Sequence, residues 1–486
     1  MIAAYAVEPV RAAERVLLAR LPEGTLMGRA ATGLARVCGA LLGRVYGARV
    51  ALLVGAGDNG GDALYAGAVL ARRGARVEAL LLGARAHAGG VAALASAGGR
   101  VSSDAARLDT ADLVVDGILG IGGRGGLRPE AALVTTRAEA GPGLVVAVDV
   151  PSGVDPSTGE VTGAAVRADV TVTFGAVKPG LLVEPGAGYA GRVEFVDIGL
   201  GPLLGRPDVE TLERPDVAGL VPRPTAGSDK YRRGVVGVVA GSDAYTGAAV
   251  LAVGGALRAG AGMVRYLGPD TAAALVRDHW PEAVLGPGRV QAWVVGPGLG
   301  TDEAGLGRLE PVLAGDQPAV LDADAVTLLG ARGLSRRAPT VLTPHAGELA
   351  RLLGVDRAEV EARRLHHARA AARRHAAVVL LKGATTVVAA PDGGVRVNPT
   401  GTPWLATAGS GDVLAGLVGT LLAAGLNRVD AASAGAWLHG QAGRICSGDG
   451  DGRGQGGPVT SYDVLSALPA AYRFVGGGPA LGGSGV

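Results

Sequence analysis

The feature that most constrains this chain is a repeated alternation of short apolar runs with helix-like segments. Several runs are continuous stretches of Val and Leu, which is typical of strands that are covered on both faces. Strand–helix alternation predicts an α/β fold with a doubly wound, mostly parallel sheet. In the first part of the chain we expect strands at Arg49–Gly55, Ala75–Gly83, Asp112–Gly120, Leu144–Asp149, Asp169–Gly175 and Arg192–Gly199.

The pattern breaks near residues 201–224, which are rich in Pro, Gly and charge and which we interpret as a linker or domain edge. The chain has 486 residues, more than one core usually holds, so two α/β domains are expected. The second series of expected strands is Gly234–Gly241, Met263–Gly268, Ala292–Gly296, Ala319–Asp322, Thr340–Thr343 and Val378–Lys382, followed by a hairpin of Thr386–Ala390 and Val395–Asn398. Helices are then expected to open at Gly411 and to cover Ala431–Arg444 and Ser461–Leu468.

Composition excludes some classes of function. The net charge is +2, from 46 basic and 44 acidic residues, which gives no electrostatic basis for binding nucleic acid. Two cysteines far apart favour a cytoplasmic protein without disulfides. The N-terminus does not resemble a signal peptide, and no run approaches the length of a membrane span.

The first candidate site is the glycine turn of RVALLVGAGDNGGDALYAG. Gly55, Gly57 and Gly60 fit the dinucleotide-binding pattern G-x-G-x-x-G between a strand and a helix. Asp58 and Asp62, however, bring two carboxylates to the place where a phosphate would bind, and like charges repel there.

Two further acidic residues, Asp116 and Asp149, stand at expected strand ends, and such ends converge on one crevice in a parallel sheet. Asn59, Asp116 and Ser152 could therefore supply oxygen ligands to a cation, which leaves Asp149 free to move a proton. The alternative is that Asp116 and Asp149 only cap the turns or helices that follow them.

The segments YAVEPVRAAE, GAGDNGGDALYAG, VVDGILGIGGRG, AVDVPSGVDPSTG and TFGAVKPGL resemble the epimerase domain of the bifunctional NAD(P)H-hydrate repair enzymes. The resemblance implies a Rossmann-like epimerase domain over residues 1–212, with potassium held by Asn59, Asp116 and Ser152 and with Asp149 as the catalytic residue. It also implies that the hydrate is contacted by Asp58, Asn59, Gly60, Gly61, Asp62, Gly120, Ile121, Gly122, Gly123, Arg124, Gly125 and Gly126.

Two residues depart from the family pattern, because Asp58 and Ala63 stand where the family usually has Asn and Gly. A non-catalytic binding module is therefore the rival interpretation of this domain. Lys178, one of only three lysines, is either a phosphate contact or a surface lysine in a loop.

The second candidate site is TAGSGDVLAGLVG. Gly409, Ser410 and Gly411 form a turn that opens a helix, where backbone N–H groups and the helix dipole would hold a transferring phosphate. Asp412 is placed to accept a proton from an attacking hydroxyl, although a plain glycine turn with a stabilising aspartate would have the same pattern. The run of Lys382 to Thr386 after a strand is a second phosphate-binding candidate. No zinc motif is present.

The segments GVVGVVAGSDAYTGAAVLAVGGALRAGAGMV, LDADAV, TPHAGE, LKGATTVV and NPTGTPWLATAGSGDVLAG resemble the ribokinase-like superfamily, and more closely its NAD(P)HX dehydratase domain. The resemblance implies a dehydratase domain over residues 222–475 that uses ADP, or ATP, with Mg²⁺ to return the S-hydrate to NAD(P)H. It implies nucleotide contacts at Lys382, Gly383, Ala384, Thr385, Thr386 and Gly411, and hydrate contacts at Gly298, His345 and Asp412. The family also implies a homo-oligomer. A kinase of a small alcohol is the rival for this domain.

Overall fold

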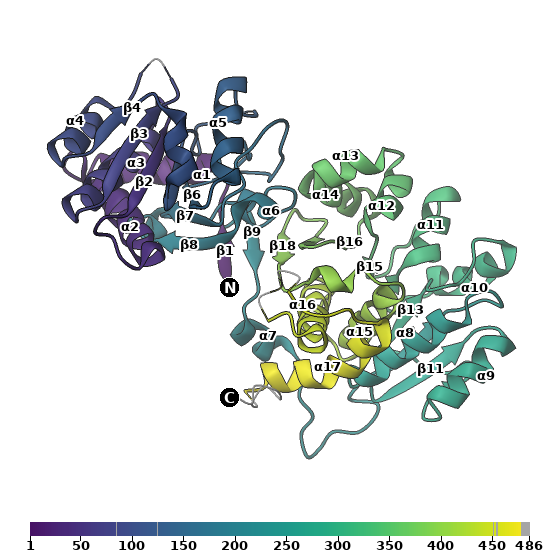
Figure 1. Cartoon of the computed structure of the whole chain (residues 1–486). Helices are drawn as coiled ribbons and strands as arrows, with labels where there is room; N and C mark the ends of the chain where they lie inside the picture. Colours follow the sequence, from purple (N-terminus) through teal and green to yellow (C-terminus); the bar gives the residue numbers. More distant parts are fainter. Residues whose placement is uncertain (84, 124, 451, 453–454, 478–486) are drawn as a thin grey trace. The chain divides into compact units, whose positions relative to one another are not determined.

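The computed structural model describes residues 1–83, 85–123, 125–450, 452 and 455–477. The chain divides into two compact units (Figure 1). Residues 3–209 form the N-terminal unit, and residues 1–2 together with 210–486 form the C-terminal unit. Each unit contains a largely parallel sheet with helices, which confirms the expected α/β class.

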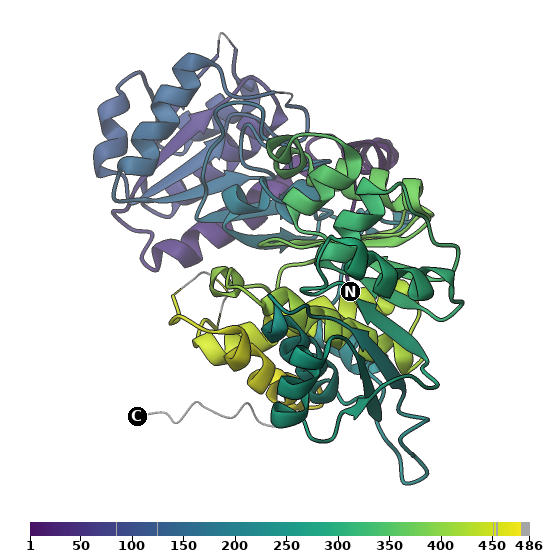
Figure 2. The same ribbon diagram turned by 90° about the vertical axis from the view of Figure 1, so that its right-hand side faces the viewer.

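The N-terminal unit is built on a seven-stranded parallel sheet with the order β4-β3-β2-β5-β6-β7-β8 (Figure 2). The order reverses between β2 and β5, and this switch point is where ligands bind in open α/β sheets. The strands are β2 Arg49–Val54, β3 Arg76–Leu81, β4 Arg100–Ser102, β5 Leu113–Gly117, β6 Leu144–Val148, β7 Val170–Phe174 and β8 Arg192–Val196. Only β4 was not expected, because this short edge strand has no buried residue and so lacks an apolar run.

Both faces of this sheet are covered, since alternate residues of β2 belong to different cores. Leu52 packs with α1, α2 and α3, whereas Leu53 packs with α5 and the preceding 3-10 turn. The helices are α1 Val7–Leu18, α2 Thr25–Leu42, α3 Asp58–Arg72, α4 Ala88–Ser96, α5 Pro129–Ala140 and α6 Ala187–Ala190. The double coverage explains why the strands are continuous apolar runs in the sequence.

The C-terminal unit contains an eleven-stranded sheet with the order β1-β9-β18-β17-β16-β15-β14-β13-β10-β11-β12. The strands from β16 to β12 are parallel, and β16, β17 and β18 are antiparallel, so the expected hairpin is present. The strands are β1 Ile2–Ala4, β9 Val209–Thr211, β10 Val235–Val239, β11 Met263–Leu267, β12 Val284–Leu285, β13 Ala292–Val295, β14 Ala319–Leu321, β15 Thr340–Leu342, β16 Val378–Leu381, β17 Thr386–Ala389 and β18 Val395–Asn398.

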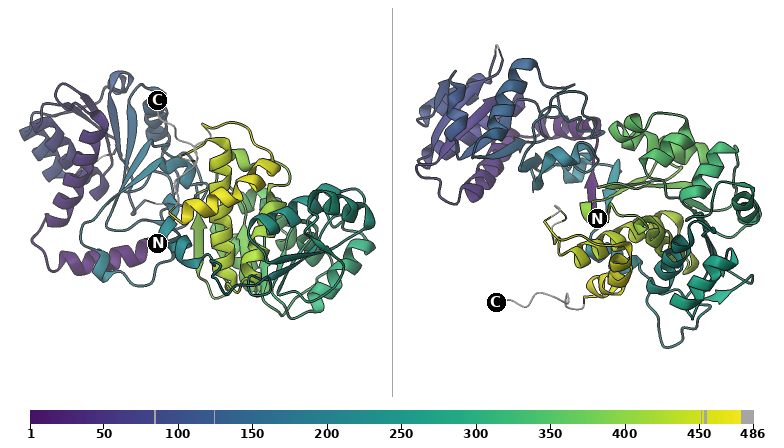
Figure 3. Two further views of the ribbon diagram at one scale, coloured as in Figure 1. Left: turned by 90° about the horizontal axis from the view of Figure 1, so that it is seen from below. Right: turned by 45° about the vertical axis from the view of Figure 1, so that its right-hand side comes forward.

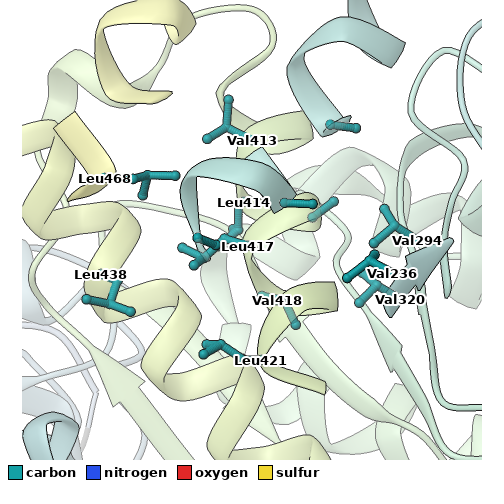
Figure 4. Packing of buried hydrophobic residues seen from close by; sticks show 14 of the residues in the cluster. Val236, Val294, Val320, Val413, Leu414, Leu417, Val418, Leu421, Leu438 and Leu468 are labelled. Atoms are coloured by element: carbon teal, nitrogen blue, oxygen red, sulfur yellow. The ribbon is translucent and has the colours of Figure 1, made fainter. Parts of the chain in front are cut away.

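Helices α8, α15, α16 and α17 pack together on one face of this sheet (Figures 3 and 4). Gly419 of α15 lies so close to Val294 and Val236 that a side chain there would overlap Val294, and this close approach places the helix over the sheet. Leu417 and Val418 belong to the same core (Figure 4). The helices are α7 Arg214–Leu220, α8 Thr246–Arg258, α9 Asp270–His279, α10 Glu303–Ala314, α11 Ala323–Ala331, α12 Ala346–Leu353, α13 Arg357–Ala362, α14 Arg364–His375, α15 Ser410–Ala423, α16 Arg428–Ser447 and α17 Ser461–Val475.

The expectation of a linker over residues 201–224 was wrong in part, because this stretch contains β9 and α7. Val209 and Thr211 are buried, and β9 pairs in parallel with β18. Helix α7 opens with a capping box between Glu213 and Asp216. The proline and charged residues that begin α7 give this stretch the composition of a linker. None of the helices in the described part of the chain combines the length and apolarity needed to cross a membrane.

Candidate active sites

A cavity of about 490 Å³ lies at the switch point of the N-terminal sheet. Its size is within the range usual for small-molecule sites. Its polar lining comes from α1, from the first two turns of α3 and from the end of β6, and comprises Arg11, Glu14, Asp58, Asn59, Asp62 and Asp149. The structure therefore brings the glycine turn and Asp149 together at this cavity, as the sequence predicted, whereas Asp116 is fully buried and does not line it. Arg11 and Glu14 were not predicted, because nothing distinguishes them from other charged residues on an amphipathic helix.

Glycine is required at two points of the cavity floor. A side chain at Gly55 would overlap the backbone of Ile118, and one at Gly60 would overlap the carbonyl of Gly55. Gly61 packs against the His87 ring. These contacts let the turn that follows β2 approach the end of β5 closely, which no larger residue would permit.

Asp116 and Ser152 form a buried pair behind the cavity. The Ser152 hydroxyl donates to Asp116 Oδ1 at 2.7 Å, and the Ser152 backbone N–H donates to Oδ2 at 2.9 Å. Burial raises the pKa of the Asp116 carboxyl to about 6, although the hydrogen bonds from Ser152 and Ile118 act in the opposite direction. Asp116 also accepts from the Ile118 N–H, so it caps a turn and also joins β5 to the residues that follow β6.

Asn59 completes this group of oxygen-bearing side chains. Its Oδ1 lies so close to Gly120 that a Cβ there would be 2.7 Å away. Its Nδ2 is buried, with no hydrogen-bond partner among the residues that the structure describes. If the amide of Asn59 is flipped, its oxygen takes the position of this unpaired nitrogen. Asn59, Asp116 and Ser152 together therefore offer the kind of oxygen ligands that a potassium ion would need.

Asp149 has a left-handed backbone with φ of 67°, an uncommon conformation for a residue with a side chain. Its Oδ1 accepts from the Phe174 N–H at 3.1 Å, from the Thr173 hydroxyl at 3.2 Å and from the ammonium of Lys178. Lys178 is thus neither a surface lysine nor a phosphate contact, and both expectations were wrong. Its side chain is 1% exposed, because the loop after β7 folds it under the sheet edge toward Asp149.

Asp62 and Glu14 face Asp149 across the cavity. Burial, with the charges of Asp149, Asp58 and Glu14, raises the pKa of the Asp62 carboxyl well above its usual 3.8. Burial and the Asp149 charge also raise the pKa of Glu14. The cavity is therefore too acidic for a plain pyrophosphate turn, as the sequence indicated.

The predicted hydrate contacts in the loop after β5 are divided between two places. Gly120, Ile121, Gly122 and Gly123 line the cavity, and Gly122 lies beside the Arg11 guanidinium. Gly125 lines a small neighbouring pocket, and Gly126 packs against Gly163. Arg124 lies outside the described residues.

The second site lies where α15 begins. Gly409 has φ of 85°, and a side chain there would overlap Leu251, so the turn requires glycine. A Cβ at Gly411 would lie 3.2 Å from the Lys382 amine and 3.9 Å from Asp322. Burial and the Asp322 charge raise the pKa of Asp412 to about 7, which suits a general base near neutral pH.

Lys382 links the two phosphate-binding candidates. Its Nζ lies 2.8 Å from Asp322 Oδ1 and 3.9 Å from Glu348 Oε2. Asp322, which follows β14, also accepts from the Thr343 hydroxyl at 2.9 Å. The carboxyl ends of β14, β15 and β16 thus bring one amine and several carboxylates to the N-terminus of α15.

Arg364 supports the loop of Lys382 to Thr386 by hydrogen bonds to its backbone. The guanidinium donates to the Lys382 carbonyl at 2.9 Å and to the Thr385 carbonyl at 3.4 Å. A side chain at Gly383 would overlap the same guanidinium. Thr385 is buried, Ala384 lies beside Gly401, and Thr386 begins β17.

His345 is positioned by its role as the N-cap of α12. Its Nδ1 accepts from the backbone N–H groups of Gly347 at 3.0 Å and Glu348 at 3.2 Å. The other ring nitrogen lies 3.4 Å from Glu348 Oε1, and half of the side chain is exposed. The capping box fixes the orientation of the His345 ring, and the exposed part of the ring can then contact a ligand.

Gly298 and His439 complete the surroundings of this site. Gly298 has φ of 58° and packs against Tyr245. His439 Nε2 lies 2.9 Å from the Ser410 carbonyl, and burial lowers its pKa to about 4, so it supports the turn as a neutral ring. Within the described residues, no three His, Cys, Asp or Glu side chains form a group that could hold a metal ion.

Comparison with known proteins gives both units a family. Residues 23–180 match the family described as YjeF-related protein N-terminus, and residues 236–450 match the family described as NAD(P)H-hydrate dehydratase. The chain is 49% identical to a bifunctional NAD(P)H-hydrate repair enzyme of Mycobacterium tuberculosis, over 88% of this chain and 91% of the relative. The corresponding enzyme of Escherichia coli is 36% identical over 86% of this chain and 84% of the relative.

A solved structure agrees with these relatives. The ADP/ATP-dependent NAD(P)H-hydrate dehydratase of Bacillus subtilis, co-crystallised with ATP and Mg²⁺, is 29% identical, with a TM-score of 0.50. It matches 55% of this chain and 99% of its own length. Together with the identity over most of the chain and the two matched domains, this shows that the chain belongs to the bifunctional NAD(P)H-hydrate repair enzymes.

Proposed function

We propose that residues 1–212 carry the epimerase activity of this family and that residues 222–475 carry the dehydratase activity. Together they would repair hydrated NAD(P)H, with the first activity interconverting the R- and S-hydrates and the second returning the S-hydrate to NAD(P)H. The observation that carries the proposal is Asp412, a partly buried carboxyl with a pKa of about 7 at the N-terminus of α15, close to Lys382 and Asp322. That arrangement suits phosphoryl transfer, since it offers one base and one cation at the N-terminus of a helix.

In the proposed dehydration, Asp412 accepts the proton of the hydrate's hydroxyl while the oxygen attacks the terminal phosphoryl of ADP or ATP. The bond from that phosphorus to the bridging oxygen breaks as the new one forms. The lone pair of the ring nitrogen then expels phosphate, and loss of a proton from the adjacent carbon restores the double bond of NAD(P)H. The helix N-terminus at Gly411 and the Lys382 amine beside it stabilise the charge that develops on the phosphoryl oxygens.

The nucleotide and Mg²⁺ of this step are inferred from the related dehydratase, which was crystallised with ATP and Mg²⁺. Mg²⁺ is usually held by one or two carboxylates together with phosphate oxygens and water. Asp322, Asp324 and Glu348 surround the place where the phosphates would lie, so the residues fit a metal held mainly by the nucleotide. Bound there, Mg²⁺ would neutralise phosphate charge.

In the proposed epimerisation, Asp149 moves a proton while the configuration of the carbon that carries the hydroxyl is inverted. Asn59, Asp116 and Ser152 would hold potassium behind the cavity and so offset the buried charge of Asp116. Asp58 keeps an oxygen acceptor where the family usually has an amide. We further expect a homo-oligomer that works in the cytoplasm.

The test supplies the purified chain with the S-hydrate of NADH, with ADP and ATP in separate reactions. The proposal predicts that NADH absorbance returns in proportion to the nucleotide consumed. A kinase of a small alcohol would leave the hydrate unchanged and would phosphorylate an added alcohol instead. For the first domain, pure R-hydrate without nucleotide should become a mixture with the S-hydrate by chromatography. An unchanged R-hydrate would mean that this domain only binds its ligand.

A further inference from the structure

Next to the cavity of the N-terminal unit, a buried amine is bonded to the lining residue Asp149, and ligand binding does not explain its role. The Lys178 ammonium donates to Asp149 Oδ1, to the Thr173 hydroxyl at 3.1 Å and to the Phe174 carbonyl at 3.0 Å. An ammonium has three protons, so all of its donors are used within the protein. With 1% of its side chain exposed, Lys178 acts only through Asp149 and its neighbours.

Asp62, which also lines the cavity, differs from Lys178 in its hydrogen bonding. Asp62 lines the cavity from the second turn of α3, and no hydrogen bond or ion pair joins its side chain to another described residue. The side chain is partly buried, and the charges that act on it are those of Asp149, Asp58 and Glu14. A partly buried carboxyl among like charges, without a partner, holds its proton more strongly than usual.

We propose that Asp62 and Asp149 form an acid–base pair across this cavity, in which Asp62 donates a proton and Asp149, held by the Lys178 ammonium, accepts one. The inference rests on the proposed epimerase function and assigns a role to each of its groups. Two carboxyls in different surroundings can divide acid and base roles, because their environments separate their protonation states.

The chemistry of this pair balances without a further reactant. Asp62 gives its proton to the hydroxyl that leaves the ring carbon as water, while the ring nitrogen lone pair forms a carbon–nitrogen double bond. A water molecule then adds to the other face of that carbon, and Asp149 takes its proton. The product is the opposite epimer. The proton returns from Asp149 to Asp62 through water in the cavity, so no oxidant or nucleotide is consumed.

The other charged groups around Asp62 are consistent with its acid role. From α1, Glu14 faces it and Arg11 lies farther along the cavity; from α3 itself, Asp58 faces it. His87 at the start of α4 packs against the neighbouring Gly61. Asp149 is the facing carboxyl that has an ammonium bonded to it. The structure therefore gives the two carboxyls different partners in the same cavity.

The experiment measures R-to-S epimerisation by the full chain without nucleotide, in wild type and in Asp62→Asn, Lys178→Met and Lys178→Arg variants. General acid–base catalysis contributes roughly 100-fold or more, so Asp62→Asn and Lys178→Met should each lower kcat by about 100-fold. Lys178→Arg should recover part of this loss, because it restores a cation. Asp109→Asn, the same change on an exposed residue paired with Arg137, should leave the rate unchanged.

Two further readouts separate this role from a structural one. KM for the R-hydrate should change little in Lys178→Met, whereas kcat falls. The wild-type rate should decline at high pH as Asp62 loses its proton, and any residual rate of Asp62→Asn should lack this decline. An Asp62→Asn variant with wild-type kcat, or with the same alkaline decline, would overturn the pair. Failure of the wild type itself to epimerise would instead refute the proposed function.

Discussion

The dehydratase account makes a quantitative prediction about Asp412→Asn. Burial and the charge of Asp322 raise the pKa of Asp412 to about 7 from its usual 3.8. The folded chain therefore binds this proton more tightly than the unfolded chain does. Stability from this group is fully present below pH 4 and is lost as the pH rises toward 7. The difference between the folded and unfolded pKa of Asp412 lowers the free energy of unfolding at pH 8 by at most about 4 kcal/mol, relative to an uncharged side chain.

Asparagine has nearly the same shape and no charge, so Asp412→Asn should abolish dehydration and also stabilise the ligand-free C-terminal unit. We expect a gain of about 2–4 kcal/mol at pH 8 and almost none at pH 4. Denaturant unfolding of the full chain, followed by the fluorescence of Trp280 and Trp437 in the C-terminal core, measures this gain.

The wild-type turnover number should rise tenfold for each pH unit below about 7 and level off above it. An Asp412→Asn variant that is destabilised at pH 8, or equally stabilised at both pH values, would refute the argument that the surroundings of Asp412 raise its pKa.

Four further changes have expected outcomes. Asp149→Asn should abolish epimerisation by chromatography and leave dehydration of the S-hydrate intact. Arg364→Ala should raise KM for ADP about tenfold with little change in kcat, since the phosphate-binding loop loses its support. Gly409→Ala should destabilise the C-terminal unit by about 3 kcal/mol in denaturant unfolding, because it combines a positive φ with an overlap on Leu251. Replacing potassium by a large organic cation should slow epimerisation, and Asp116→Asn should remove that dependence; a rate indifferent to potassium would exclude the cation site.

The sequence predicted the fold well because strands covered on both faces are continuous apolar runs. It failed at β9 and α7, whose Pro and charged residues form helix caps and so imitate a linker. Short edge strands such as β4 were also missed, since a strand without a buried residue has no apolar signature.

The sites were predictable where glycine spacing and strand ends carry the chemistry, as at Gly409 and Asp149. The position of Lys178 was not predictable, because only the folded structure turns this loop lysine inward to contact Asp149. Glu14 was missed for a related reason, since only the packing of α1 over the cavity distinguishes it from a surface glutamate. Residues from distant segments become a site through tertiary structure, and their spacing in the sequence does not show this.

The most direct test of the central claim supplies the purified chain with pure R-hydrate of NADH and follows NADH absorbance with ADP and without it. The account predicts that ADP brings full return of NADH, since one chain would epimerise the R-hydrate and dehydrate the S-hydrate. Asp149→Asn should reduce this return to the uncatalysed rate of epimerisation, and pure S-hydrate should still be repaired. If wild type with ADP repairs the R-hydrate no faster than the Asp149→Asn variant does, the claim that this chain carries both activities is wrong.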